Sequence, residues 1–300
     1  MNDLESLLMY RDLSAQVYGL WRKAVIDKDR EAKAEIRRLL SSNLKHFIIT
    51  EYPTTGYRAR IVRPEKMKNL VITERNNWFS GPSGIHGFLG SEMGAPTKNA
   101  SCGRANKKNK PVLYLASDVQ TACAEVQPSF ENLISVALFS IQKGLRIVDF
   151  REIPVVYQTF TEADTSEKVI NSVFCSSIIE IFRMPVSSLE PDLYKYGQFL
   201  SGRLRAHRID GILYQSSHNQ NDSAYNFVLF NPQNANCENE YGDLYKCLSI
   251  KTTFQNISVN SSKKSFQPLE AGRSREPVLW NENLMLLQNL KAQRGLSEEK

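Results

Sequence analysis

Residues 111–125 read Pro-Val-Leu-Tyr-Leu-Ala-Ser-Asp-Val-Gln-Thr-Ala-Cys-Ala-Glu and predict a strand followed directly by a helix. The first six residues, 111–116, have the composition of a buried strand. Ser117, with Gln120 three residues later, is typical of a capping box at the start of a helix. Pro128 ends that helix. A strand, a turn and a helix in this order can bring side chains from both elements to one wall of a pocket.

Strands and helices continue to alternate around this stretch. Residues 74–110 interrupt them, because glycine and proline are frequent there and indicate loops. No G-x-G-x-x-G follows a strand, and the alternation is too irregular for a doubly wound sheet. The sequence therefore predicts an α+β fold, with mixed, largely antiparallel sheets and flanking helices. The expected strands are 57–64, 133–141, 145–150, 212–214, 225–230 and 244–250, and the expected helices are 166–183 and 191–206.

The two ends of the chain differ from this body. Apolar residues recur at three- and four-residue steps through residues 3–45, with one interruption at 27–29, which predicts an α-hairpin. We expect this hairpin to dock on its own body rather than on a partner. Beyond about residue 256 the chain is rich in Ser, Asn and Lys, with one weak helix near 281–292. The expected division is a helical hairpin at 1–50, a catalytic body at 51–255 and a polar extension at 256–300.

The composition indicates a folded protein in a reducing compartment. Hydrophobic residues make up 41% of the 300 residues, enough for a sizeable core. The five cysteines are odd in number and show no C-x-x-C spacing, which disfavours a disulfide framework and a structural zinc site. The chain starts with acidic residues and has no apolar run of membrane-spanning length, so we expect a cytoplasmic protein without a membrane partner.

The charge balance selects no partner by itself. A net charge of +6 is compatible with nucleic acid, an acidic membrane or a phosphorylated small molecule. Lys and Arg are not interleaved with aromatic residues as in RNA-recognition motifs, which disfavours nucleic acid. No His, Cys and Asp cluster has the spacing of metal ligands, so no metal is expected.

Three residues in and around the 111–125 stretch are candidates for chemistry. Arg104 lies in a glycine-punctuated loop before the strand, Tyr114 lies in the strand, and Glu125 lies on the helix. Taken alone, each has a simpler explanation: a surface arginine, a core tyrosine and a solvated glutamate. Glu125, however, is flanked by Ala122 and Ala124, which suggests close packing. A carboxylate on a packed face needs a partner or a function.

Six short motifs, taken together, resemble a RES domain. The resemblance covers about residues 55–232, with the motifs in the family's order, and it is specific only as a set. The first half comprises residues 57–60 (Tyr-Arg-Ala-Arg), 103–106 (Gly-Arg-Ala-Asn), 113–117 (Leu-Tyr-Leu-Ala-Ser) and 121–126 (Thr-Ala-Cys-Ala-Glu-Val). The second half comprises residues 210–217 (Asp-Gly-Ile-Leu-Tyr-Gln-Ser-Ser) and 226–230 (Asn-Phe-Val-Leu-Phe).

The resemblance implies a fold similar to ADP-ribosyltransferase toxins, NAD⁺ as the substrate, and often a helix-turn-helix antitoxin as the partner. Loop 218–224 is longer than in many members, which leaves the shape of the pocket rim open. Arg60 could take the place of Arg58, and Ser217 that of Ser216. The implied catalytic residues are Glu125, Arg58 and Ser216, and the implied NAD⁺-binding residues are Arg104, Tyr114, Arg60, Ser217 and Asn226.

The residue types suit the implied chemistry. The nicotinamide–ribose bond breaks through an oxocarbenium-like state, which a single carboxylate such as that of Glu125 can stabilise. Arginines bind a pyrophosphate through forked, charge-assisted donors. We expect Tyr114 to stack on the nicotinamide ring and Ser216 to donate to a phosphate or ribose oxygen.

Three functions remain open from the sequence. The leading one is a toxin or defence enzyme that destroys NAD⁺, by hydrolysis or by phosphorolysis. The second is transfer of ADP-ribose to a protein or nucleic acid target. The third is a non-catalytic nucleic-acid-binding module. The sequence leaves the oligomeric state open, including a homo-oligomer.

Overall fold

The computed structural model describes residues 3–73, 84–96, 99–157, 166–184, 193–219, 221 and 223–250. The chain divides into two compact units, Met1–Leu248 and Ser249–Lys300, and every element described here belongs to the first. The helix expected near 281–292 lies outside the described residues. The expected boundaries at residues 50 and 255 stay predictions.

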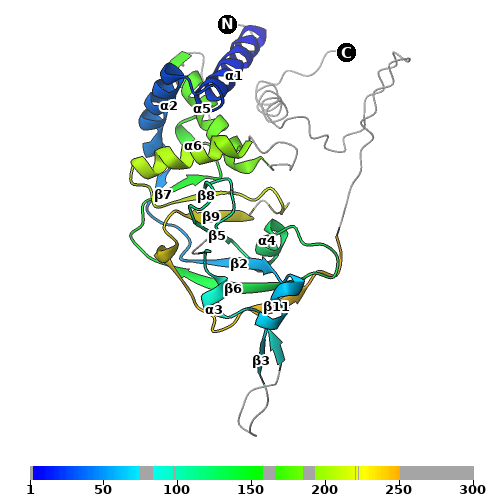
Figure 1. Cartoon of the computed structure of the whole chain (residues 1–300). Coiled ribbons are helices and arrows are strands. Elements are labelled where there is room, and N and C mark those ends of the chain that lie inside the picture. The colour runs from blue at the N-terminus through cyan, green and yellow to red at the C-terminus, as the bar shows by residue number, and fades with distance from the viewer. Residues whose placement is uncertain are drawn as a thin grey trace, which may run out of the picture. The chain divides into compact units, whose positions relative to one another are not determined.

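A nine-stranded mixed sheet forms the centre of the first unit (Figure 1). Its order is β1-β7-β8-β9-β5-β2-β6-β10, and β11 also pairs with β6. All its pairs are antiparallel except β7 with β8, so the α+β prediction with largely antiparallel strands is confirmed. The strands are β1 (Ile48–Ile49), β2 (Thr55–Ile61), β5 (Leu113–Ala116), β6 (Leu133–Ile141), β7 (Ile147–Phe150), β8 (Gly211–Gln215), β9 (Tyr225–Leu229), β10 (Ala235–Cys237) and β11 (Asp243–Lys246).

The sheet has two halves that meet at β5 and β2. The ladder between these strands consists of one residue pair, Tyr57 with Ala116. In contrast, β2 pairs with β6 over seven residues, from Thr55 to Ile61. Because β2 leaves β5 after a single pair, the strand that carries Arg58 diverges from the strand that carries Tyr114. Helix α4 (Val119–Glu125) follows β5 directly and packs on β2 at this junction.

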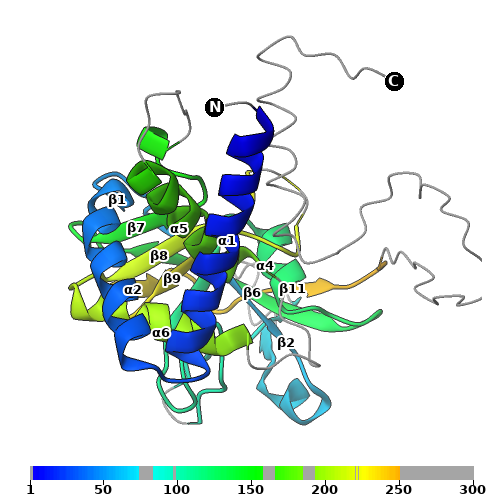
Figure 2. The same cartoon turned by 90° about the horizontal axis from the view of Figure 1, so that it is seen from above.

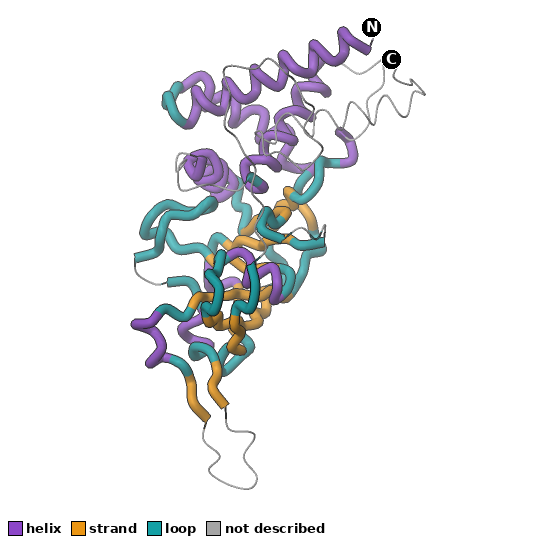
Figure 3. Tube along the Cα trace, turned by 90° about the vertical axis from the view of Figure 1, so that its right-hand side faces the viewer, coloured by secondary structure: helices purple, strands orange, loops and turns teal. Residues whose placement is uncertain are grey.

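Four long helices gather over β7, β8 and β9, at the opposite end of the sheet from β11 (Figures 1 and 2). They bury the larger apolar cluster, in which Trp21, Phe174 and Ile212 are almost inaccessible to solvent. Figure 3 shows the same segregation, with the helical layer at one end and the strands below it. The helices are α1 (Asp3–Val25), α2 (Arg30–Asn43), α5 (Ser166–Arg183) and α6 (Leu193–Ala206).

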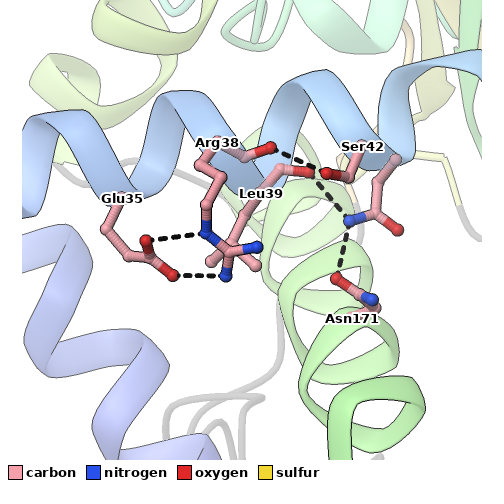
Figure 4. Close-up of polar contacts among 6 residues, drawn as sticks. Glu35, Arg38, Leu39, Ser42 and Asn171 are labelled. Atoms are coloured by element: carbon pink, nitrogen blue, oxygen red, sulfur yellow. Dashed lines mark hydrogen bonds and ion pairs between the residues drawn. The ribbon is translucent and has the colours of Figure 1, made fainter.

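The N-terminal hairpin, α1 and α2, docks on α5 of the same unit. Trp21 of α1 stacks on Phe174 with ring centroids 5.7 Å apart and donates through Nε1 to Ser177 Oγ at 2.8 Å. Asn43 of α2 donates through Nδ2 to Asn171 Oδ1 at 2.9 Å and to the Leu39 carbonyl at 2.8 Å (Figure 4). Buried polar groups are therefore paired across this interface, as burial requires.

The start of α4 differs from the sequence expectation. Asp118, not Ser117, is the N-cap, and its Oδ1 accepts from the Thr121 backbone N–H at 2.8 Å. Ser117 instead donates through Oγ to Asp118 Oδ2 at 2.7 Å. The capping-box interpretation was wrong because a carboxylate one residue later is an equally good cap and takes the position. The helix ends at Glu125, three residues before Pro128.

Residues 74–110 are not entirely loop. They contain β4 (Gly84–His86), which pairs with β3 (Val71–Thr73) in a separate two-stranded sheet, and the one-turn helix α3 (Gly90–Met93). Four short 3₁₀ segments complete the elements of the described residues: Leu44–His46, Pro64–Asn69, Val155–Tyr157 and Pro232–Asn234.

We predict that Trp21→Ala lowers the free energy of unfolding by about 3–5 kcal/mol, since a large buried side chain and its hydrogen bond to Ser177 are both lost. Equilibrium denaturant unfolding measures this change. The exposed neighbour Arg22, changed to Ala, is the control and should shift stability by less than about 0.5 kcal/mol. Equal effects of the two variants would mean that α1 is not docked on α5.

Candidate active site

The site is built around the carboxylate of Glu125, the last residue of α4. Its Oε1 accepts from Ser216 Oγ at 2.6 Å and from Asn226 Nδ2 at 2.8 Å. Ser216 follows β8 and Asn226 lies in β9, so three distant segments of the chain meet at one oxygen atom. Both donors are buried, with 5% and 4% of their surfaces exposed. The site depends on the fold rather than on local sequence.

Strand register brings these segments together. Asn226 pairs with Ala116 of β5 on one side and with Tyr214 of β8 on the other. Residues in register on neighbouring strands point to the same face of a sheet, so these three side chains lie in a row. Helix α4, which begins three residues after Ala116, covers that face and carries Glu125 over Asn226.

The hydroxyl of Ser216 has its bonding capacity fully used. A serine hydroxyl offers one proton and two lone pairs. Its oxygen accepts from the backbone N–H groups of His218 and Asn219, both at 3.2 Å. The proton is therefore left for Glu125 Oε1. The sequence expectation that Ser216 donates to a phosphate or ribose oxygen does not describe this arrangement, in which the hydroxyl orients the carboxylate.

The second carboxylate oxygen, Glu125 Oε2, is differently placed. Among the described residues, none donates a hydrogen bond to it, and it is not one of the buried polar atoms that lack a partner. Oε1 is thus held by two donors, while Oε2 remains accessible. A carboxylate in this state is rigid and still has a free acceptor to offer to a ligand.

Arg104 lies over the ring of Tyr214. Its guanidinium donates to the carbonyl of Phe182 and, at 2.7 Å, to that of Met184, at the C-terminal end of α5. Cations are favourable at a helix C-terminus because of the macrodipole. The guanidinium carbon lies 5.6 Å from the centroid of the Tyr214 ring. Arg104 is therefore fixed in place by α5 and by an aromatic face.

Tyr114 holds the loop that carries Arg104. Its hydroxyl accepts from the Ala105 backbone N–H at 2.9 Å and donates to Asn106 Oδ1 at 2.9 Å. Burial raises the pKa of Tyr114 to about 12, so the hydroxyl keeps its proton. Gly103 is required there, because an added Cβ would lie 2.7 Å from the Tyr114 hydroxyl. The expected stacking role of Tyr114 stays a prediction, whereas its positioning of the loop is visible.

Tyr214 lies between the residues around Glu125 and those around Arg104 in the sense that both charges act on its phenol. Burial is the largest cause that raises its pKa, the positive charge of Arg104 opposes this, and the charges of Glu125 and Tyr114 add to it. All three side chains therefore lie close enough to Tyr214 to act on its phenol. The structure brings Arg104, Tyr114 and Glu125 close to Tyr214. The expected convergence of Arg58, Arg104, Glu125 and Ser216 around one ligand, and the role of each residue, stay predictions.

Arg58 on β2 is a cation that forms no ion pair with the described residues. Its Nη1 is buried and has no hydrogen-bond partner among the described residues. Burial, together with the nearby positive charge of Arg60, lowers the pKa of Arg58 to about 10, and Tyr114 acts in the opposite direction. A buried guanidinium is costly unless an anion pairs with it. The arrangement suits a negatively charged ligand.

Arg60 and Ser217, the alternatives to Arg58 and Ser216, have other surroundings than those two residues. Arg60 donates to the Glu92 carbonyl and lies over the Phe88 ring, with 5.5 Å between the guanidinium carbon and the centroid. It is therefore engaged with the α3 region. Ser217 is partly exposed beside Ser216, and it is the hydroxyl of Ser216 that reaches Glu125.

A cavity of about 490 Å³ lies elsewhere in the unit and includes none of the expected site residues. Leu113 and Phe139 are among the residues that line it, together with residues of α3 and β10. Leu113 alternates with Tyr114 along β5, so its side chain points to the opposite face of the sheet. We assign the site from the converging polar groups rather than from this cavity.

The sequence did not point to three contributors. Tyr214 underlies Arg104, and Asn219 and Thr121 are linked by a hydrogen bond of 2.8 Å between Asn219 Nδ2 and Thr121 Oγ1. Thr121 lies in the strand–helix segment 111–125, one helical turn before Glu125, and this spacing is the one signal that the sequence offers. Among the described residues there is no group of three or more His, Cys, Asp or Glu that could hold a metal ion.

We predict that Arg58→Met raises the free energy of unfolding at pH 7 by about 1–3 kcal/mol. The folded state keeps this guanidinium charged against a lowered pKa, and removing it relieves that cost. Denaturant unfolding without added anions measures the change. Arg60→Met is the matched comparison and should instead destabilise, because its guanidinium bonds the Glu92 carbonyl. Loss of stability in Arg58→Met would show that a partner holds this group.

A known protein family matches this chain. The family model described as RES domain matches residues 80–247, more than half of the chain. The match includes Arg104, Glu125 and Ser216, whereas Arg58 lies before it. No curated protein sequence matches the chain. No helix among the described residues is both long and apolar enough to cross a membrane. The chain belongs to the RES-domain family, and with it to proteins of a generally NAD-related, toxin-like role.

Proposed function

We propose that this protein is a RES-type toxin or defence enzyme that cleaves the nicotinamide–ribose bond of NAD⁺. The observation that carries the proposal is the state of Glu125. One of its oxygens is held by Ser216 and Asn226, and the other is left for a ligand.

The chemistry needs a fixed negative charge more than it needs an acid. As the bond to nicotinamide lengthens, positive charge develops on the ribose ring, as in glycoside cleavage. Nicotinamide leaves as a neutral base, so no proton has to be supplied to it. A preorganised carboxylate stabilises the cationic ribose or orients the attacking group without reorganising during the reaction. Glu125, with Oε1 immobilised, meets this requirement.

The two arginines supply charge for the pyrophosphate. Arg58 has a buried guanidinium nitrogen without a partner, so an incoming phosphate oxygen could satisfy it. Arg104 is held near Tyr214 by the carbonyls of Phe182 and Met184, which are neutral acceptors. Because ADP-ribose is anionic, these cations favour its binding through charge-assisted hydrogen bonds.

The acceptor and the biological setting are also proposals. Water or phosphate as acceptor would deplete cellular NAD⁺, in keeping with a toxin in the cytoplasm that a helix-turn-helix antitoxin neutralises. A protein or nucleic acid acceptor would make the same site an ADP-ribosyltransferase. A purely nucleic-acid-binding module is less well supported, because such a function does not need a carboxylate held by two buried donors.

We predict that Glu125→Gln lowers the rate of nicotinamide release from NAD⁺ by about 10²-fold or more. Glutamine keeps the size of the side chain but removes the negative charge from the developing oxocarbenium. Release is measured on purified protein by chromatography. Glu131→Gln is the matched control, since Glu131 is an exposed carboxylate that pairs with Lys246, and it should retain the parental rate. A fully active Glu125→Gln variant would refute the assignment.

We predict that NAD⁺ labelled in its adenylate part yields free, low-molecular-weight label when incubated with the protein and a cell lysate. Free ADP-ribose indicates water as the acceptor, and its phosphorylated form indicates phosphate. Label on a macromolecule would replace the depletion proposal by transfer. Binding of nucleic acid that weakens steeply with salt, without nicotinamide release, would favour the binding module.

A further inference from the structure

A chain of directed hydrogen bonds runs from the start of α4 to the catalytic candidate Glu125. It begins at Asp118, the N-cap of α4. Thr121 donates through Oγ1 to Asp118 Oδ2 at 2.6 Å, and Ser117 donates to the same oxygen at 2.7 Å. Burial alone would raise the pKa of Asp118, but the hydrogen bonds from Thr121 and Ser117 outweigh it and lower the pKa. Asp118 is thus an ionised acceptor that fixes the direction of the Thr121 proton.

The direction of that proton determines what Thr121 offers to its other neighbour. Because the Thr121 hydroxyl donates its proton in a hydrogen bond to Asp118, the lone pairs of its buried oxygen can accept from Asn219 Nδ2, at 2.8 Å. The orientation of the Asn219 amide is fixed as well, because its Oδ1 accepts from the backbone N–H of Asn221 at 3.1 Å. A side chain in loop 216–221 is therefore tied to the first turn of α4.

The same tie places the backbone of the loop. The N–H groups of His218 and Asn219 both point at Ser216 Oγ. They occupy its lone pairs, so the hydroxyl proton is directed at Glu125 Oε1. Without them the hydroxyl could rotate and donate elsewhere, and Glu125 would keep only the bond from Asn226.

We propose that Thr121 and Asn219 are positioning residues for the reaction, which hold loop 216–219 so that Ser216 can donate only to Glu125. The inference rests on the proposed function, because it assigns these residues to the orientation of the carboxylate. Neither residue touches Oε2 in the structure, so both act through Ser216. They should therefore affect the chemical step more than the binding of NAD⁺.

The test uses purified full-length variants. Thr121→Val keeps the volume and branching of a fully buried side chain but removes the acceptor, and Thr121→Ser keeps the hydroxyl. Asn219→Ala removes the donor at a position that is not fully buried, which guards against a misfolded Thr121→Val. Ser223→Ala, an exposed change in the same loop region, is the control and should leave the activity unchanged.

We expect Thr121→Val and Asn219→Ala each to lower kcat for nicotinamide release by about tenfold, because the hydrogen bond from Ser216 to the charged Glu125 carboxylate would no longer be enforced. KM for NAD⁺ should stay within about twofold, and Thr121→Ser should retain roughly half of kcat or more. The idea is overturned if kcat is unchanged in the first two variants, if Thr121→Ser loses as much as Thr121→Val, or if KM rises instead.

A second measurement separates this inference from the proposed function. Hydrogen exchange of the backbone N–H groups of residues 218 and 219 should become about tenfold faster in Thr121→Val and Asn219→Ala, but not in Thr121→Ser or Ser223→Ala. If the parent protein releases no nicotinamide, the proposed function fails. Hydrogen exchange would still report whether the Thr121–Asn219 hydrogen bond holds the loop. Unchanged exchange in both Thr121→Val and Asn219→Ala would overturn the inference, whatever their activity.

Discussion

Two hydrogen bonds to one oxygen atom, Glu125 Oε1, are the constraint on which the site depends. The donors come from the end of β8 and the start of β9, and the acceptor comes from the helix after β5. They meet only in the observed register, with Asn226 between Ala116 and Tyr214. A slip of one residue in β9 would turn the Asn226 side chain to the opposite face of the sheet.

The electrostatics of the site are incomplete without an anion. Arg58 and Arg104 bring two guanidinium groups to the neighbourhood of Tyr114 and Tyr214, and the Glu125 carboxylate is directed at neutral donors rather than at either of them. A buried cation without a paired acid, such as Arg58, costs folding stability. Such a cost is typical of functional sites, where groups are preorganised for a ligand rather than for each other. A dinucleotide with its pyrophosphate would complete the balance.

The helical layer contributes more than a cover for the sheet. Arg104 is anchored at the C-terminus of α5, and α5 is in turn held by α1 through Trp21 and by α2 through Asn43. The hairpin precedes the segment that matches the RES-domain model, yet it packs in the same apolar cluster as α5. The position of one binding candidate thus depends on residues outside the matched segment, through packing that admits little slack.

Local patterns in the sequence predicted the longer helices and strands and the candidates for chemistry, but not the short strands β1, β3, β4 and β10. The predicted strand at 133–141 and helix at 166–183 have the same bounds in the structure, since their apolar periodicity is long and uninterrupted. The motifs around Arg104, Glu125 and Ser216 identified the family. Contacts between distant segments determine that Ser216 rather than Ser217 donates to Glu125, that Arg60 donates to the Glu92 carbonyl, and that Asn219 donates to Thr121. These choices depend on strand register and on loop closure between residues far apart in the chain, and local composition carries no information about either.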